Sequence, residues 1–223
     1  MNKNIAKRVA QVFFSLVLQG VILFLCAWTI QWQWAWILLS FNIVILIVNF
    51  NVLPKEVIEE RGRKKENVKK WDRILTSINI IPVVGIYAIA GLDYRYQWSL
   101  ELNNAFHASS LIFYVLGSML FTWAMVNNRY FSTMVRLQRE RGHQVATSGP
   151  YRFVRHPGYL GLIVVTLSVS PALGSLYALI MSAISVILFV IRTKLEDTTL
   201  KAELDGYADY SKRVRYRLVP HVW

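Results

Sequence analysis

Long apolar runs are the feature of this sequence that most limits its possible folds. They cover residues 9–30, 33–53, 74–92, 108–127 and 159–191. Each of the first four has about the 20 residues that an α-helix needs to cross the hydrocarbon core of a bilayer. A chain of 223 residues that is 55% apolar and carries such runs does not fit a soluble domain. We predict an all-α integral membrane protein.

The fifth run, residues 159–191, is too long for one ordinary span. Pro171 and Gly174 lie near its middle and favour a break, because proline lacks the helical N–H donor and glycine tolerates turns. We therefore predict a helical hairpin of residues 159–170 and 174–191. The predicted fold class is four single transmembrane helices plus this C-terminal helical hairpin.

The pattern divides the chain into two regions. Residues 1–127 form a four-helix transmembrane region with a charged connector at 54–73. Residues 128–223 contain the hairpin 159–191 and the last two basic segments, and we predict that they form the binding region. Its C-terminal part is expected to be a cytoplasmic helix.

The net charge of +12 is unevenly distributed along the chain. Lys and Arg number three before the first run, eight in 54–73, six in 128–158 and seven from 192 onward, while 93–107 holds only Arg95. This alternation follows the positive-inside rule and predicts that both termini are cytoplasmic. The excess charge therefore indicates topology and contact with membrane lipids, with no nucleic-acid partner. A bacterial inner membrane and an endoplasmic reticulum membrane fit the pattern equally.

The chain has a single cysteine, Cys26, inside the first apolar run. One thiol excludes an intramolecular disulfide and a thiolate metal cluster. The sequence also lacks GxGxxG and Walker glycine patterns, so it predicts neither a metal site nor a soluble-type nucleotide fold.

Two further helices are expected next to the membrane. The spacing of apolar and basic residues after position 128 predicts a helix along the inner surface that ends at Gly142. Residues 192–214 predict a cytoplasmic helix that Gly206 interrupts or bends. If that helix is continuous, one face within about 60° carries Glu196, Glu203, Tyr207 and Tyr210.

The stretch GPYRFVRHPGYLG, residues 149–161, combines glycines and prolines, which interrupt regular structure, with charged side chains at the edge of the hairpin. Gly149 and Pro150 set a turn, and Pro157 biases His156 towards an extended backbone. Irregular backbone at membrane depth is tolerated inside protein or against a cavity, so we predict a pocket that Arg152, Arg155 and His156 line or border. A simpler explanation is that these side chains only anchor the chain at the interface.

The same stretch resembles the isoprenylcysteine carboxyl methyltransferase family and its prokaryotic relatives. The resemblance rests on GPY at 149–151, RHP at 155–157 with Tyr159, the acidic pair Glu196-Asp197, and Tyr207 with Tyr210 before a basic stretch that ends at Pro220. It covers about the C-terminal 85 residues, whereas the first four runs agree only as apolar spans.

The resemblance implies an S-adenosylmethionine-dependent methyltransferase with a cytoplasmic pocket made by the RHP loop, the hairpin and the C-terminal helix. Arg155 and Glu196 are the implied catalytic residues. The implied cofactor-binding residues are Gly149, Pro150, Tyr151, His156, Pro157, Tyr159, Glu196, Tyr207 and Tyr210.

The resemblance favours a lipid-like or small acceptor with a carboxylate, which Arg155 would position. A carboxylate of pKa near 3.5 is already ionised at neutral pH, whereas a thiol of pKa near 8.5 would need a base such as His156. Thiol S-methylation therefore stays open. The Arg-rich stretch between Tyr210 and Pro220 departs from the family pattern, so the acceptor pocket is expected to differ. An apolar helical chain with a basic C-terminal region is also compatible with an NADPH-dependent membrane reductase, and with a transporter or scaffold.

Overall fold

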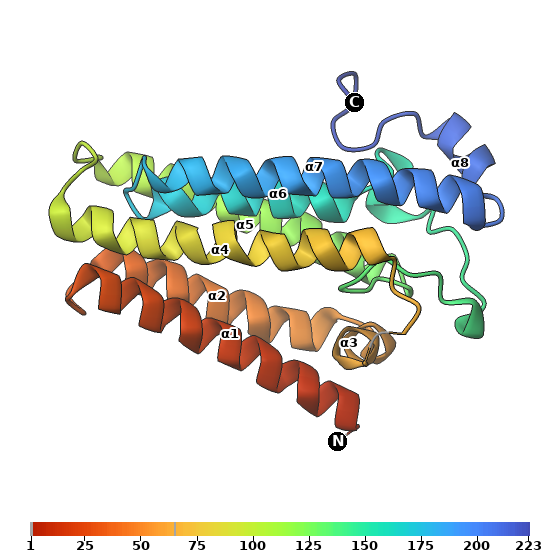
Figure 1. Ribbon diagram of the computed structural model, residues 1–223, viewed down its shortest axis with the longest axis horizontal. Coiled ribbons are helices and arrows are strands. Elements are labelled where there is room, and N and C mark those ends of the chain that lie inside the picture. The colour runs from red at the N-terminus through yellow and green to blue at the C-terminus, as the bar shows by residue number, and fades with distance from the viewer. Residues whose placement is uncertain (1, 65) are drawn as a thin grey trace.

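The computed structural model describes residues 2–64 and 66–223, and every regular element in these ranges is helical. Six longer helices run along the molecule: α1 (Lys3–Ala27), α2 (Gln33–Val52), α4 (Lys70–Tyr96), α5 (Asn104–Val126), α6 (Pro157–Ala172) and α7 (Ala178–Glu203) (Figure 1). The shorter elements are α3 (Lys55–Gly62), α8 (Tyr207–Arg213) and the 3-10 turns η1 (Arg139–Arg141) and η2 (Gly149–Arg152).

The helices fit a multi-pass membrane protein. α1, α2, α4, α5 and α7 are long and apolar enough to cross a bilayer, and α6 is apolar but shorter. This confirms the predicted all-α membrane fold. The hairpin also breaks where Pro171 and Gly174 predict, because α6 ends at Ala172 and Gly174 takes a left-handed φ of 81°.

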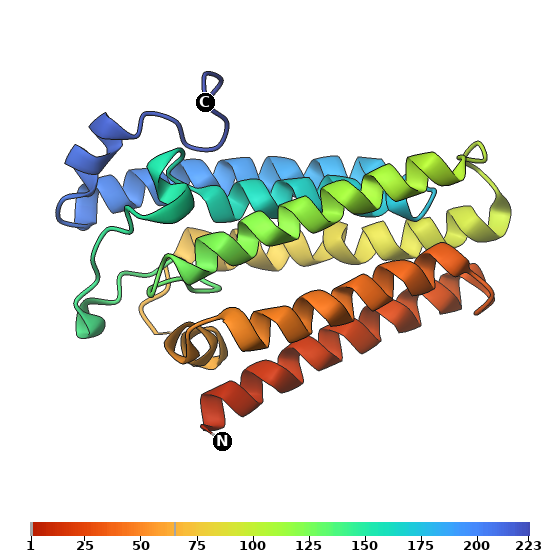
Figure 2. The same cartoon turned by 180° about the vertical axis from the view of Figure 1, so that it is seen from behind.

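One end of the bundle collects the segments that the site needs. Figure 1 shows the N-terminus, α3, α8 and the C-terminus towards the same end, and the turns α1–α2, α4–α5 and α6–α7 at the other end. Seen from behind, α5 crosses in front of α6 (Figure 2). These two helices approach closely, since a Cβ on Gly161 would meet the carbonyl oxygen of Gly117 at 2.7 Å.

The prediction of a surface helix after position 128 is wrong. Only the single turn η1 is helical between α5 and η2. The backbone groups of this segment bond to distant partners instead: the N–H of Val135 donates to Asp72 Oδ2 at 2.7 Å, and the N–H of Lys69 donates to the carbonyl oxygen of Val135 at 3.1 Å. Tyr130 and Val135 are buried, so burial across the bundle end outweighs the helical pattern.

The C-terminal helix also differs from a continuous 192–214 helix. α7 runs without a break from the bundle to Glu203, and the chain then turns at Gly206, whose φ is 78°. The short helix α8 follows. Interruption at Gly206 is therefore confirmed, and it redirects Tyr207 and Tyr210 back towards the turn that precedes α6.

Candidate active site

The turn before α6 is paired with the C-terminal tail. The backbone N–H groups of Arg155 and His156 donate to the carbonyl oxygens of Tyr216 and Arg217, each at 2.9 Å. The donors of this irregular stretch are thus satisfied without a helix or sheet. The pairing brings the tail over the RHP loop.

Local residue types explain the course of this turn. Gly149 has a φ of 56°, and a Cβ there would lie 2.4 Å from the side chain of Asn127. Pro157 is the first residue of α6, where its missing N–H costs no helical hydrogen bond. His156 is therefore the residue at which the chain enters the helix.

Asp197 joins the turn, the tail and α8. Its carboxylate is fully buried and accepts from Arg155 Nε at 2.7 Å, from Arg217 Nε at 3.0 Å and from the Tyr207 hydroxyl at 3.0 Å. A buried carboxylate needs such partners because desolvation of an unpaired charge is costly. Asp197 belongs to the acidic pair seen in the sequence. No local sequence pattern indicates that Asp197, and not Glu196, forms these buried ion pairs.

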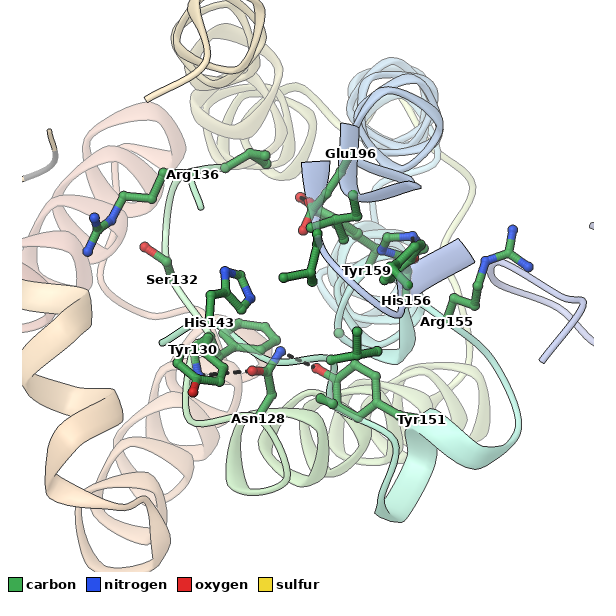
Figure 3. A pocket seen from close by; sticks show the side chains of 18 of the residues that line it. Asn128, Tyr130, Ser132, Arg136, His143, Tyr151, Arg155, His156, Tyr159 and Glu196 are labelled. Atoms are coloured by element: carbon green, nitrogen blue, oxygen red, sulfur yellow. Dashed lines mark hydrogen bonds between the residues drawn. The ribbon is translucent and has the colours of Figure 1, made fainter. Parts of the chain in front are cut away.

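Arg155, an implied catalytic residue, has a largely intramolecular role in this arrangement. Its Nη1 donates to the carbonyl oxygens of Val214 and Arg215 at 2.8 and 2.7 Å, in addition to the ion pair with Asp197. Burial, which lowers the pKa of Arg155, is outweighed by the hydrogen bond and charge of Asp197, which raise it. The guanidinium holds the tail on the turn, and Figure 3 shows it directed away from the centre of the cavity.

A cavity of about 310 Å³ lies at this end of the bundle, a size within the range of small-molecule sites. Among the implied site residues it is lined by Tyr151, Arg155, His156, Tyr159, Glu196, Tyr207 and Tyr210. Gly149, Pro150 and Pro157 are not part of its wall and shape the backbone beside it. Arg152 is exposed. Figure 3 shows Tyr159 of α6, Glu196 of α7 and several residues of the segments that follow α5 around the cavity.

Glu196 is the carboxylate of the cavity wall. It accepts a hydrogen bond from the Tyr159 hydroxyl at 2.5 Å, and the residue is only partly buried. The guanidinium carbon of Arg192 lies 5.4 Å from the centre of the Tyr159 ring, but Arg192 itself pairs with Asp72 at 2.6 Å. Glu196 thus faces the cavity with acceptor capacity for a ligand.

Three buried tyrosines keep their hydroxyl protons. Burial raises the pKa of Tyr151, Tyr207 and Tyr210 above the usual value of 10. Tyr210 donates to the carbonyl oxygen of Tyr151 at 2.7 Å, and Asn128 donates to the Tyr151 hydroxyl at 3.3 Å. The hydroxyl groups of Tyr207 and Tyr210 are donors fixed by these contacts, and all three side chains line the cavity.

A further part of the cavity wall was not predicted from the sequence. Asn128, Tyr130 and His143 line it, and Figure 3 shows the His143 ring beside Tyr130, with centroids 4.5 Å apart. Burial, then Arg136 and Arg141, lowers the pKa of His143 from 6.5 to about 4. These residues come from the segment predicted as a surface helix, and only His143, a lone histidine after Gly142, carried a weak signal.

The arrangement suits a polar ligand with a cationic group. Glu196 offers an anion, the ring faces of Tyr130 and Tyr159 offer cation-π contacts, and the first amides of α6 lack helical acceptors. Within residues 2–64 and 66–223, no group of three His, Cys, Asp or Glu side chains is placed to hold a metal ion.

Comparison with known proteins finds relatives for part of the chain. The sequence model of the isoprenylcysteine carboxyl methyltransferase family matches residues 110–202, from α5 to the end of α7. Protein-S-isoprenylcysteine O-methyltransferase of Schizosaccharomyces pombe is 32% identical over 50% of this chain and 48% of its own length. Protein-S-isoprenylcysteine O-methyltransferase B of Arabidopsis thaliana is 29% identical over 45% of this chain and 52% of its own length.

A probable protein-S-isoprenylcysteine O-methyltransferase of Oryza sativa subsp. indica is 34% identical over 24% of this chain and 29% of its own length. The chain therefore spans about half the length of the first two curated relatives, and less of the third. The match to the family covers the RHP loop, α6 and Glu196, whereas α1–α4 and α8 lie outside it.

Proposed function

We propose, from the match of residues 110–202 to the isoprenylcysteine carboxyl methyltransferase family, that the chain is a membrane methyltransferase that uses S-adenosylmethionine. The single observation that carries the proposal is the cavity in which Tyr159, Glu196 and His156 meet inside the matched segment. The names of the relatives support this function over that of a reductase or a transporter.

When bound, S-adenosylmethionine would supply the methyl group from its sulfonium. The nucleophilic atom of the acceptor would form the new bond to the methyl carbon, and the electron pair of the broken S–CH₃ bond would stay on sulfur. The residues of the cavity need mainly to align and enclose the reactants, which is worth about 7–11 kcal/mol for well-oriented groups. Glu196 would accept hydrogen bonds from the ammonium or ribose end, and the rings of Tyr159 and Tyr151 would lie against cationic or aromatic parts. His156 would contribute chiefly its ring, since its Nε2 lies 3.3 Å from Asp197 and 3.2 Å from the Tyr207 hydroxyl.

The acceptor that the cavity fits best is a carboxylate on an apolar body. A carboxylate needs no base, whereas a thiol of pKa near 8.5 must lose its proton. His143 is a poor base for that step because its pKa is about 4. Phe121, Phe131 and Leu162 form an apolar part of the wall that suits a lipid-like substituent.

Binding of labelled S-adenosylmethionine to the purified protein in lipid nanodiscs tests the proposal. We expect Glu196→Gln to weaken binding about tenfold or more, because it removes the charge from the cavity carboxylate. Glu203→Gln is the matched control on α7, since Glu203 pairs with Lys69 at 2.6 Å and does not line the cavity.

Methyl transfer to an N-acetylated S-prenylcysteine should be lost in parallel with donor binding. Wild-type protein that retains NADPH and no S-adenosylmethionine would contradict the proposal. Equal donor affinity in the Glu196→Gln and Glu203→Gln variants would remove its structural basis.

A further inference from the structure

We propose that Arg61 of α3 binds the carboxylate of the methyl acceptor inside the cavity. Arg61 lies outside residues 110–202, so the match to the family does not cover it. The assignment rests on the proposed function. It adds that the acceptor is anionic and that Arg61 is the side chain that selects it.

Charge balance around the cavity distinguishes Arg61 from the other arginines. Arg136 pairs with Glu60 at 3.1 Å, Arg155 pairs with Asp197, and Arg192 pairs with Asp72. In the part of the chain that the structure describes, no carboxylate lies within ion-pair distance of the Arg61 guanidinium. It is the cavity-lining arginine whose positive charge the described residues leave uncompensated.

The environment of the Arg61 guanidinium also favours an anionic ligand. Its carbon lies 5.5 Å from the centre of the Phe121 ring and 5.6 Å from that of Phe131, and the two rings pack edge to face. Burial, then the charges of Arg8 and Arg192, lowers the pKa of Arg61 to about 9. A cation held on apolar rings, with other cations nearby, gains more from an incoming anion than a solvated cation does.

The position of Phe131 connects Arg61 to the reaction site. A Cβ on Gly158 would meet the Phe131 ring at 2.8 Å, so this ring lies directly against the first turn of α6. Gly158 and Tyr159 line the same cavity as Arg61. An acceptor with its carboxylate at Arg61 therefore rests on the Phe121–Phe131 pair. This pair lies beside the turn that carries implied cofactor-binding residues.

The charge of the two reactants decides which of them Arg61 binds. S-adenosylmethionine carries one carboxylate with an ammonium and a sulfonium, so its net charge is positive and the uncompensated charge of Arg61 repels it. The acceptor is an anion before transfer and a neutral ester afterwards. Arg61 thus favours the substrate over the product and promotes product release.

The test compares an N-acetylated S-prenylcysteine that bears a free carboxylate with the same molecule as its carboxamide, in nanodiscs without the donor. We expect wild-type protein to prefer the carboxylate by about tenfold or more, as for a charge-assisted hydrogen bond. Arg61→Gln should reduce this preference to within about twofold, and Arg61→Lys should restore part of it. The ratio of affinities is insensitive to the fraction of folded protein.

Arg63→Gln is the matched control, because Arg63 lies two residues away, pairs with Glu59 at 3.7 Å and does not line this cavity. It should keep the full preference for the carboxylate. In the presence of the donor, Arg61→Gln should raise the acceptor KM with little change in kcat, and donor affinity should stay within about twofold of wild type.

An unchanged carboxylate preference in Arg61→Gln overturns the assignment, and so does loss of donor affinity, which would show that the donor carboxylate is the partner. If the wild-type protein binds no S-adenosylmethionine but discriminates the carboxylate through Arg61, the proposed function fails and the anion site stands. If it binds neither probe, both proposals fail.

Discussion

Burial and two neighbouring arginines all lower the pKa of His143. The Nδ1 atom accepts a hydrogen bond from the backbone N–H of Gln138 at 3.2 Å, so this nitrogen is unprotonated in the folded protein. Desolvation, then Arg136 and Arg141, disfavours the imidazolium, and Glu140 only partly offsets them. His143 is therefore a neutral part of the cavity wall at neutral pH.

This predicts how stability depends on pH. The pKa of His143 falls from 6.5 in an ordinary environment to about 4 in the folded protein, so the unfolded chain takes up the proton first as pH falls. We expect the contribution of this residue to be constant above about pH 6.5 and to become destabilising between pH 6.5 and 4. The apparent Tm in detergent, followed by tryptophan fluorescence, measures it.

His143→Gln keeps a hydrogen-bond acceptor and cannot titrate, so the fall in Tm over this window should become shallower. His221→Gln, at the exposed end of the tail, is the control and should leave the wild-type profile unchanged. Identical profiles for wild type and His143→Gln would contradict the assigned pKa.

At the scale of elements, the C-terminal tail is ordered by bonds to other segments. Residues after α8 contain no further helix, yet the carbonyl groups of Val214, Arg215, Tyr216 and Arg217 all accept from Arg155 or His156. Asp197 of α7 holds Arg155 and Arg217 together. The position of the tail on the RHP loop thus depends on a strand-like pairing that one buried carboxylate stabilises.

Replacement of Asp197 by Asn tests this dependence. The change leaves the guanidinium of Arg155 buried without its counterion, and breaking such a pair costs about 3–5 kcal/mol. We expect Asp197→Asn to expose the bonds after Arg213, Arg215 and Arg217 to trypsin and to weaken donor binding. Limited proteolysis followed by mass spectrometry of the tail is the measurement.

Asp209→Asn provides the comparison on α8. Asp209 pairs only with Lys212, and both side chains are largely exposed, so this pair contributes little to stability. Its cleavage pattern should match that of wild type. A tail equally resistant in both variants would show that Asp197 does not hold it.

On the scale of the whole molecule, the helices separate two chemically different ends. The basic connector, the segment after α5 and the tail gather at the end that carries the cavity, while the opposite end has few charges. α7 links the two, since it crosses the bundle and carries Glu196 and Asp197 at its cavity end. A polar cavity at the end of an apolar helical bundle is the result.

We predict that the cavity end faces the cytoplasm. In a Cys26→Ser background, Glu66→Cys and Asp205→Cys place thiols at exposed sites near the cavity, and Glu101→Cys places one at the opposite end. Impermeant maleimide should label Glu101→Cys in intact cells, whereas the other two variants should react only after the membrane is opened. Labelling of all three from outside, or the reverse pattern, would contradict the positive-inside assignment.

Hydropathy, charge alternation and the helix-breaking residues predicted the long apolar helices, the break at Pro171–Gly174 and the turn at Gly206 from the sequence alone. These are local properties, because a run of apolar residues or a glycine acts through its immediate neighbours. For the same reason the stretch 149–161 pointed to the cavity before any contact was known.

Only the tertiary structure decided which charges are paired. Arg192 and Asp72 are 120 positions apart, and Arg155 and Asp197 are 42 apart, so no local pattern reveals that these arginines are neutralised while Arg61 is left to bind a ligand. The segment after α5 is irregular for the same reason, because its partners include Glu60 of α3, Asp72 of α4 and Arg192 of α7. Local sequence dictates what can cross a membrane, whereas desolvation and long-range pairing dictate which side chains face the cavity.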